Sequence, residues 1–182
     1  MRKTSPLTKC VTTAVCLALC VVLPMALHAI PNAGKLFSPM HIPVLLCGLV
    51  CGWQYGLVCG LLGPVISSLL TSMPPMGSPV LYGMIVELAV YGLAAGLLMQ
   101  FVRTGRTAAD VYISLVIAML AGRIAGGLAK ALFFSDGSYT FQAWAAAYFV
   151  TSLPGIIIHL ILVPVLYAAV SKAHLTPVRY QR

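Results

Sequence analysis

The sequence predicts an all-α integral membrane protein, a six-transmembrane-helix bundle with both termini in the cytoplasm. Hydrophobic residues make up 60% of the 182 residues, charged residues only 8%, and the mean hydropathy is +1.00. Because a soluble domain carries about 25% charged residues, this composition excludes a water-soluble globular protein. The long apolar runs show neither the alternation of a half-buried strand nor the polar stripe of a soluble helix. We expect one membrane domain that covers residues 1–182.

The stretch that organises the rest is residues 37–70, FSPMHIPVLLCGLVCGWQYGLVCGLLGPVISSLL. Its glycines at positions 48, 52, 56 and 60 recur at every fourth residue. This spacing places small residues on nearly one helix face, where a second helix can approach backbone to backbone. A break at Gln54-Tyr55-Gly56 divides the stretch into a short helix and a longer one, with Trp53 and Gln54 as the tight joint between them. We therefore expect a glycine-lined hairpin against which the other apolar segments pack.

Six apolar segments are expected as helices, at approximately residues 8–30, 41–52, 55–71, 80–102, 109–133 and 143–171. The first contains the about 20 residues that a span requires, whereas the second is too short to cross the bilayer alone. Arg2 and Lys3 before an apolar run are also typical of a cleaved signal peptide. We expect this segment to be retained as a helix, because His28 suits a cleavage site near residues 26–29 poorly.

The positive charges predict the orientation of the chain. With the N-terminus inside, eight Lys and Arg residues fall on the inner side: Arg2, Lys3, Lys9, Arg103, Arg106, Lys172, Arg179 and Arg182. Only Lys35 falls on the outer side, and this asymmetry places both termini in the cytoplasm. The three longer loops then face outward, which favours capture of a substrate from outside. The net charge of +8 does not indicate nucleic-acid binding, because the cations form no basic helix or patch.

Five polar side chains that fall inside the apolar segments are candidate substrate-binding residues: Glu87, Tyr91, Arg123, Lys130 and His159. A charged group in the bilayer costs at least ~2.5–3.5 kcal/mol, so Glu87 and Arg123 are expected to face the bundle interior or water. They form either a structural ion pair or the walls of an outward pocket. Lys130 either lines the same pocket or extends its ammonium to the interface. His159 is either a ligand-binding residue or a hydrogen-bonded core histidine.

The sequence contains no catalytic, metal or cofactor motif, so we expect none of these functions. The six cysteines lie in or beside apolar segments without the spacings of metal sites, and such cysteines pack as small apolar residues. Without a GxxxxGK[ST] phosphate loop, ATP-driven work requires another chain. The competing function classes are an intramembrane enzyme and a small channel bundle. Ser67 lacks the motif of an intramembrane serine protease, and the three acidic residues are too scattered to form a catalytic metal site.

Three stretches carry a family resemblance. The first segment contains an AxxxA pattern at Ala14 and Ala18. The hairpin HIPVLLCGLVCGWQYGLVCGLLGPVISSLL covers residues 41–70, and PVLYGMIVEL covers residues 79–88. Together they resemble the substrate-binding S components of energy-coupling factor (ECF) vitamin transporters, in which the hairpin is the most recognisable stretch. The likeness extends over nearly the whole chain, including its length, its six segments and its orientation.

The resemblance implies a multi-pass subunit of a prokaryotic cell membrane that binds one water-soluble vitamin or precursor. This subunit would dock through Ala14 and Ala18 on an ECF membrane coupling subunit that two cytoplasmic ATPases drive. The alternative for the AxxxA pattern is close packing within this chain. Members of the family are thought to topple in the bilayer to carry the substrate inward, and their outward loops cover the ligand. The resemblance therefore implies that Asn32 and His41 reach over the bound substrate.

The balance of charge gives an expectation for the substrate. In the outer half of the bundle, Arg123 and Lys130 exceed Glu87 by one positive charge, a surplus that an anion or water offsets. Arginine also holds a carboxylate through two parallel hydrogen bonds. A small vitamin with one carboxylate fits this balance better than the cation thiamine. Pantothenate is the leading candidate, because its hydroxyls and amide suit the other polar residues, and the remaining vitamins that use this scaffold stay open.

Overall fold

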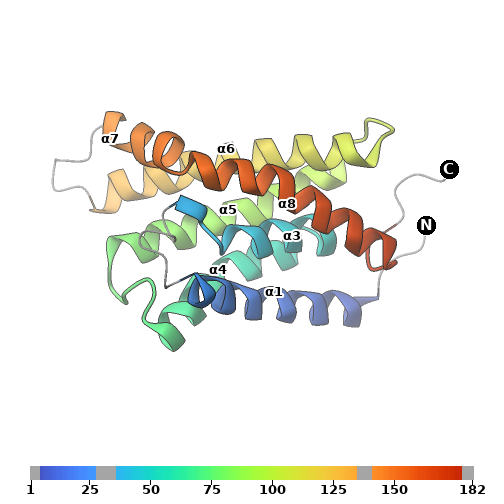
Figure 1. Cartoon of the computed structure of the whole chain (residues 1–182), viewed down its shortest axis with the longest axis horizontal. Coiled ribbons are helices and arrows are strands. Elements are labelled where there is room, and N and C mark those ends of the chain that lie inside the picture. Colours follow the sequence, from blue (N-terminus) through green and yellow to red (C-terminus); the bar gives the residue numbers. More distant parts are fainter. Residues whose placement is uncertain (1–4, 28–35, 135–140, 178–182) are drawn as a thin grey trace.

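The computed structural model describes residues 5–27, 36–134 and 141–177, and this part of the chain is all-helical. Its elements are α1 (Pro6–Ala26), α3 (His41–Cys51), α4 (Trp53–Thr71), α5 (Pro79–Phe101), α6 (Thr107–Phe134), α7 (Phe141–Ala145), the π-helix η1 (Ala146–Thr151) and α8 (Leu153–Lys172). By length and composition, α1, α4, α5, α6 and α8 can each cross a membrane, whereas α3 has only 11 residues. Helix α1 begins and α8 ends at the same end of the bundle (Figure 1). We call this the terminal end, and the opposite one the distal end.

Two Ser-Pro pairs start α1 and α5 slightly earlier than the sequence predicted. The hydroxyl oxygen of Ser5 accepts the N–H of Thr8 at 3.1 Å, and that of Ser78 accepts the N–H of Leu81 at 3.3 Å. The proline that follows each serine suits the first helical position, where no backbone N–H is needed. Helix α1 ends at Ala26, before the predicted end at residue 30, and positions 28–30 lie outside the described residues.

The glycine-lined contact predicted for the hairpin is confirmed, and α5 is the helix that fills it. A methyl group added to Gly48 would lie 2.5 Å from the carbonyl oxygen of Gly92, and one added to Gly56 would overlap the same oxygen. A methyl group on Gly60 would overlap the carbonyl of Leu88. The backbones therefore touch, and a larger side chain has no room at these positions.

The break in the hairpin lies at Gly52, so the prediction of a break at Gln54-Tyr55-Gly56, with a joint at Trp53 and Gln54, is wrong. Gly52 has a φ of 99°, a left-handed conformation that glycine adopts without steric cost. Helix α4 begins directly afterwards, at Trp53 and not at Tyr55. Gly52 therefore makes the turn and does not belong to the packing face of the other three glycines.

Replacing Gly60 by alanine is expected to destabilise the protein, although alanine favours a helix by up to about 1 kcal/mol. Overpacking of this kind costs about 1–3 kcal/mol or more, because the backbone carbonyl of Leu88 cannot move aside. The matched control is Gly63→Ala on the same helix, where the added methyl group meets the movable thiol of Cys20 at 3.1 Å. Thermal unfolding in detergent micelles measures the Tm of both variants. A Tm of Gly60→Ala at or above that of the wild type would contradict the prediction.

The last predicted segment is not one continuous helix from residue 143 to residue 171, and this prediction is wrong. The chain forms α7, then the π-helix η1, and α8 starts only at Leu153. Pro154 stands at the start of α8 and has no N–H to continue the preceding helix. The N–H of Ser152 instead donates to the carbonyl of Val150. The carbonyls around position 148 are thereby available to side chains.

Helix α3 forms the centre of the bundle. It packs against α1, α4, α5 and α8, and all of its residues except Ile42 are buried. His41 begins this helix toward the distal end, and Cys51 closes it toward the terminal end. Anything at either end of α3 therefore lies between several helices, and the two sites described below occupy these two ends.

Candidate functional site

A cluster of buried polar side chains lies at the distal end of α3. Five of the predicted residues meet here from four helices, and none exposes more than 5% of its surface: His41, Glu87, Tyr91, Arg123 and His159. Buried polar groups in such number require partners inside the protein or in a ligand. This cluster is the candidate site.

The carboxylate of Glu87 is held by two neighbours. Its Oε1 accepts the hydroxyl of Tyr91 at 2.9 Å and lies 3.4 Å from Nε2 of His41. Glycines on α6 make the room: a methyl group on Gly126 would lie 2.8 Å from Cβ of Glu87, and one on Gly122 would overlap the ring of Tyr91. The ion pair of Glu87 in the described part of the chain is therefore with His41, and not with Arg123.

Two histidines of the cluster, His41 and His159, stack on each other. The rings of His41 and His159 are stacked with centroids 5.5 Å apart and an interplanar angle of 13°. His41 also meets the ring of Tyr91 edge-on at 5.0 Å. Among the described residues, Nδ1 of His41 and both ring nitrogens of His159 have no hydrogen-bond partner of good geometry. These nitrogens can bind hydroxyl or amide groups of a ligand.

Arg123 is bound by neutral groups of the π-helix. Its Nη1 donates to the carbonyl oxygen of Tyr148 and, at 2.7 Å, to the hydroxyl of Ser152. That hydroxyl in turn donates to the same carbonyl at 2.5 Å. The Nε group, on the other edge of the guanidinium, is buried without a partner among the described residues. The guanidinium is thus fixed in orientation with one edge left for a ligand.

Lys130 lies seven residues after this arginine, about two turns further along α6. Its aliphatic stem packs on Gly83, where an added methyl group would come within 2.5 Å of Cε. Its ammonium lies 4.9 Å from the centre of the Tyr148 ring, an arrangement that cation–π attraction favours. The same side chain thus adds a second positive charge near Arg123.

An apolar cavity adjoins the cationic side of the cluster. It has a volume of about 150 Å³. Besides Arg123, its walls are six apolar side chains from α6, η1 and α8: Val116, Met119, Leu120, Phe149, Ile156 and Leu160. An apolar cavity of this size holds a group as large as a benzene ring. The site therefore offers polar, cationic and apolar contacts side by side.

Two of the predicted residues, Ala14 and Ala18, lie outside this cluster, and a third is not described. Asn32 lies outside the described residues, so its role over the ligand stays a prediction. Ala14 and Ala18 are exposed on the surface of α1. Their exposure is compatible with docking on a partner, which also stays a prediction.

The residues that hold Arg123 were not predicted from the sequence. Tyr148 and Ser152 bind its guanidinium, and the indole of Trp144 donates to its backbone carbonyl at 3.4 Å. Pro154 inside an apolar segment was the available signal, because a proline frees carbonyls of the preceding turn. Gly127 was a second signal, since a side chain there would overlap the ring of Trp144.

Comparison with known proteins gives one family. Residues 8–167 match the family model of the ECF transporter, substrate-specific component. No curated protein and no solved structure matches the chain. Members of this family are transporter subunits, so the alternative of an intramembrane enzyme is excluded. The match covers most of the chain and includes every element that builds the cluster. The chain therefore belongs to the substrate-specific components of ECF transporters, as a multi-pass membrane subunit that binds a transported substrate.

Proposed function

We propose that this subunit binds a small water-soluble vitamin or precursor that carries one carboxylate, and that pantothenate is its substrate. The binding site is the distal cluster around His41, Glu87 and Arg123. The single observation that carries the proposal is the state of Arg123, a buried cation whose hydrogen-bond partners among the described residues are all neutral. A ligand carboxylate on its Nε edge supplies the missing negative charge.

The balance of charge in the cluster supports an anionic substrate. The carboxylate of Glu87 is engaged by His41 and Tyr91. Within the described part of the chain, no ion pair joins Arg123 or Lys130 to a carboxylate. The two cations exceed the one carboxylate of Glu87 by one positive charge. A buried surplus of this kind disfavours a cationic substrate and favours an anion.

The neutral surfaces of the site match the rest of pantothenate. The ring nitrogens of His41 and His159 that lack partners can bind its hydroxyls and its amide. The apolar cavity beside Arg123 has room for its two methyl groups. A ligand that joins a carboxylate to hydroxyls through a short branched chain can contact Arg123, the two histidines and the apolar cavity together.

Calorimetric titration of the purified subunit tests this assignment. We expect pantothenate to bind and thiamine, a cation, to give no heat of binding. The matched control ligand is pantothenol, which replaces only the carboxylate by an alcohol. Its affinity is expected to be at least about thirtyfold lower, because the buried arginine loses its charged partner. Equal affinities for pantothenate and pantothenol would contradict the anionic site, and binding of a different carboxylate vitamin would keep the site but change the substrate.

The subunit would transfer its substrate to an ECF membrane coupling subunit and two cytoplasmic ATPases. Family membership supports interaction with this module. We assign the contact to Ala14 and Ala18 of α1, which are small, exposed and one helical turn apart. The terminal end of the bundle would face the cytoplasm and the distal cluster would face outward.

This orientation predicts which loops a membrane-impermeant maleimide reaches in intact cells. In a Cys10→Ser background, where the remaining cysteines are buried, Met76→Cys is expected to be labelled from outside. Arg106→Cys is expected to be labelled only after the cells are opened, because positive charges favour the inner side. Lys35, which lies outside the described residues, belongs to the outer side in this scheme. Labelling of Arg106→Cys in intact cells would contradict this orientation and place the turn outside.

A further inference from the structure

A second cavity lies at the terminal end of α3, at the opposite end from the distal cluster. It has a volume of about 160 Å³ and is lined by residues of α1, α3, α4, α5 and α8. The cavity forms where α3 stops at Cys51 and the chain turns back at Gly52, while the neighbouring helices continue past this turn. With about 30 Å³ for each water molecule, it has room for roughly five waters or a small polar group.

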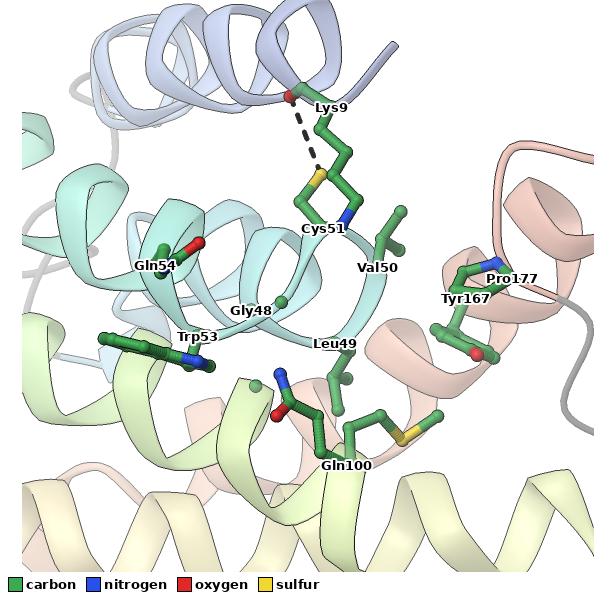
Figure 2. A pocket seen from close by; sticks show the side chains of 13 residues that line it. Lys9, Gly48, Leu49, Val50, Cys51, Trp53, Gln54, Gln100, Tyr167 and Pro177 are labelled. Atoms are coloured by element: carbon green, nitrogen blue, oxygen red, sulfur yellow. Dashed lines mark hydrogen bonds between the residues drawn. The ribbon is translucent and has the colours of Figure 1, made fainter. Parts of the chain in front are cut away.

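The polar lining of this cavity consists of donors around one cation. Lys9 of α1 extends from one side and Gln100 of α5 from the other, and both side chains reach toward the α3–α4 turn (Figure 2). Gln54 and the indole of Trp53 stand next to the turn. None of the residues that line the cavity is acidic. Such a set suits an anionic oxygen group, because an ammonium, two amides and an indole can all donate hydrogen bonds.

The position of the cavity indicates where this anion comes from. Trp, Tyr and Lys side chains are typical of the headgroup level of a membrane, and Trp53, Tyr167 and Lys9 all line the cavity. A phosphate at Lys9 would therefore lie at the level of the lipid headgroups.

We propose that this cavity binds the phosphate of an anionic phospholipid of the inner leaflet, with Lys9 as its counter-ion and Gln100 as a further donor. Basic pockets between membrane helices on the cytoplasmic side are known to hold such headgroups. The proposal rests on the orientation given above, with the terminal end inside, and not on the identity of the vitamin. The bound lipid ties the start of α1 to the turn between α3 and α4.

Trp53 provides a direct probe, because it lines the cavity and the chain has only two tryptophans. In a Trp144→Phe background, soluble dihexanoyl phosphatidylglycerol is titrated into the purified subunit while the fluorescence of Trp53 is followed. We expect a saturable change, and at least about fivefold weaker binding in Lys9→Gln. The matched control is Lys172→Gln, which removes the same charge from an exposed position outside the cavity and leaves the affinity unchanged.

Two further probes separate the possible ligands. Dihexanoyl phosphatidylcholine has the same chains but no net charge, and equal binding of it would overturn the role of the anion. Inorganic phosphate that produces the same change at the same concentration would overturn the lipid as its source. Gln100→Ala, a second variant that leaves α1 intact, is also expected to weaken binding. An unchanged affinity in both variants would overturn the site, whereas vitamin titrations of Lys9→Gln report separately on the distal cluster.

Discussion

Arg123→Ala is expected to weaken vitamin binding at least about thirtyfold. Removing one partner of a buried, charged hydrogen bond costs about 2–5 kcal/mol, and each 1.4 kcal/mol corresponds to about a tenfold change in affinity. The ammonium of Lys130 lies over the ring of Tyr148 and lacks the planar fork of the guanidinium, so it is not expected to replace Arg123. The loss is measured by calorimetric titration with pantothenate.

Two variants show whether the loss comes from the ligand contact. Arg123→Lys keeps the charge but loses the planar fork that binds two carboxylate oxygens, so it is expected to recover only part of the affinity. Arg106→Ala removes an equal charge from the exposed turn at the terminal end and is expected to bind normally. Because Arg123 also binds Tyr148 and Ser152, a thermal melt first establishes that Arg123→Ala is folded. Unchanged affinity in the folded variant would reduce Arg123 to a structural residue.

The glycine spacing of the hairpin predicted a helix contact because this contact depends on one local property. Every fourth residue in a helix lies on nearly the same face, so the absence of side chains at Gly48, Gly56 and Gly60 is visible in the sequence. The structure adds the partner, since the carbonyls of Leu88 and Gly92 occupy the space. Periodicity shows that a face is open, but not which helix closes it.

The partner of Glu87 from another helix could not be predicted, because sequence spacing shows neighbours only within one helix. Tyr91 lies four residues further along α5 and was expected on the same face. His41 lies 46 residues earlier, and its approach depends on α3 occupying the centre of the bundle. The residue that stood out as a natural counter-ion, Arg123, turns instead toward the π-helix. Charge alone identified the buried residues but did not determine how they pair.

The π-helix is the element that sequence periodicity concealed. Residues 143–171 are predominantly apolar, and hydrophobicity alone does not distinguish a continuous helix from one that reorganises at Ser152. Yet this reorganisation brings the Tyr148 carbonyl and the Ser152 hydroxyl to Arg123. Single-turn π-helices are frequent at functional sites because they redirect backbone groups in this way. In this chain, Pro154 has no N–H for the carbonyl of Val150, which accepts the N–H of Ser152 instead.

Replacing both Ala14 and Ala18 by tryptophan is expected to abolish vitamin uptake while vitamin binding stays intact. Both alanines are exposed on α1 and neither belongs to the distal cluster. Two small residues one turn apart let a partner helix approach closely, and two indole rings prevent that approach. Uptake of labelled vitamin by cells that contain the whole ECF module should then fall to the level of cells without this subunit. Titration of the purified double variant should give the wild-type affinity.

The matched control for this pair is Ile124→Trp with Leu128→Trp on α6. These residues have the same four-residue spacing and expose 55% and 58% of their surfaces. They present bulky apolar groups to the surroundings already, so two further rings are expected to leave uptake unchanged. If the α1 variant retained uptake, docking would not use Ala14 and Ala18. If it lost vitamin binding as well, α1 would be supporting the fold, because Cys16 and Cys20 on the same helix are buried in the core. Loss of uptake with unchanged affinity is the one result that assigns the exposed face of α1 to the partner subunit.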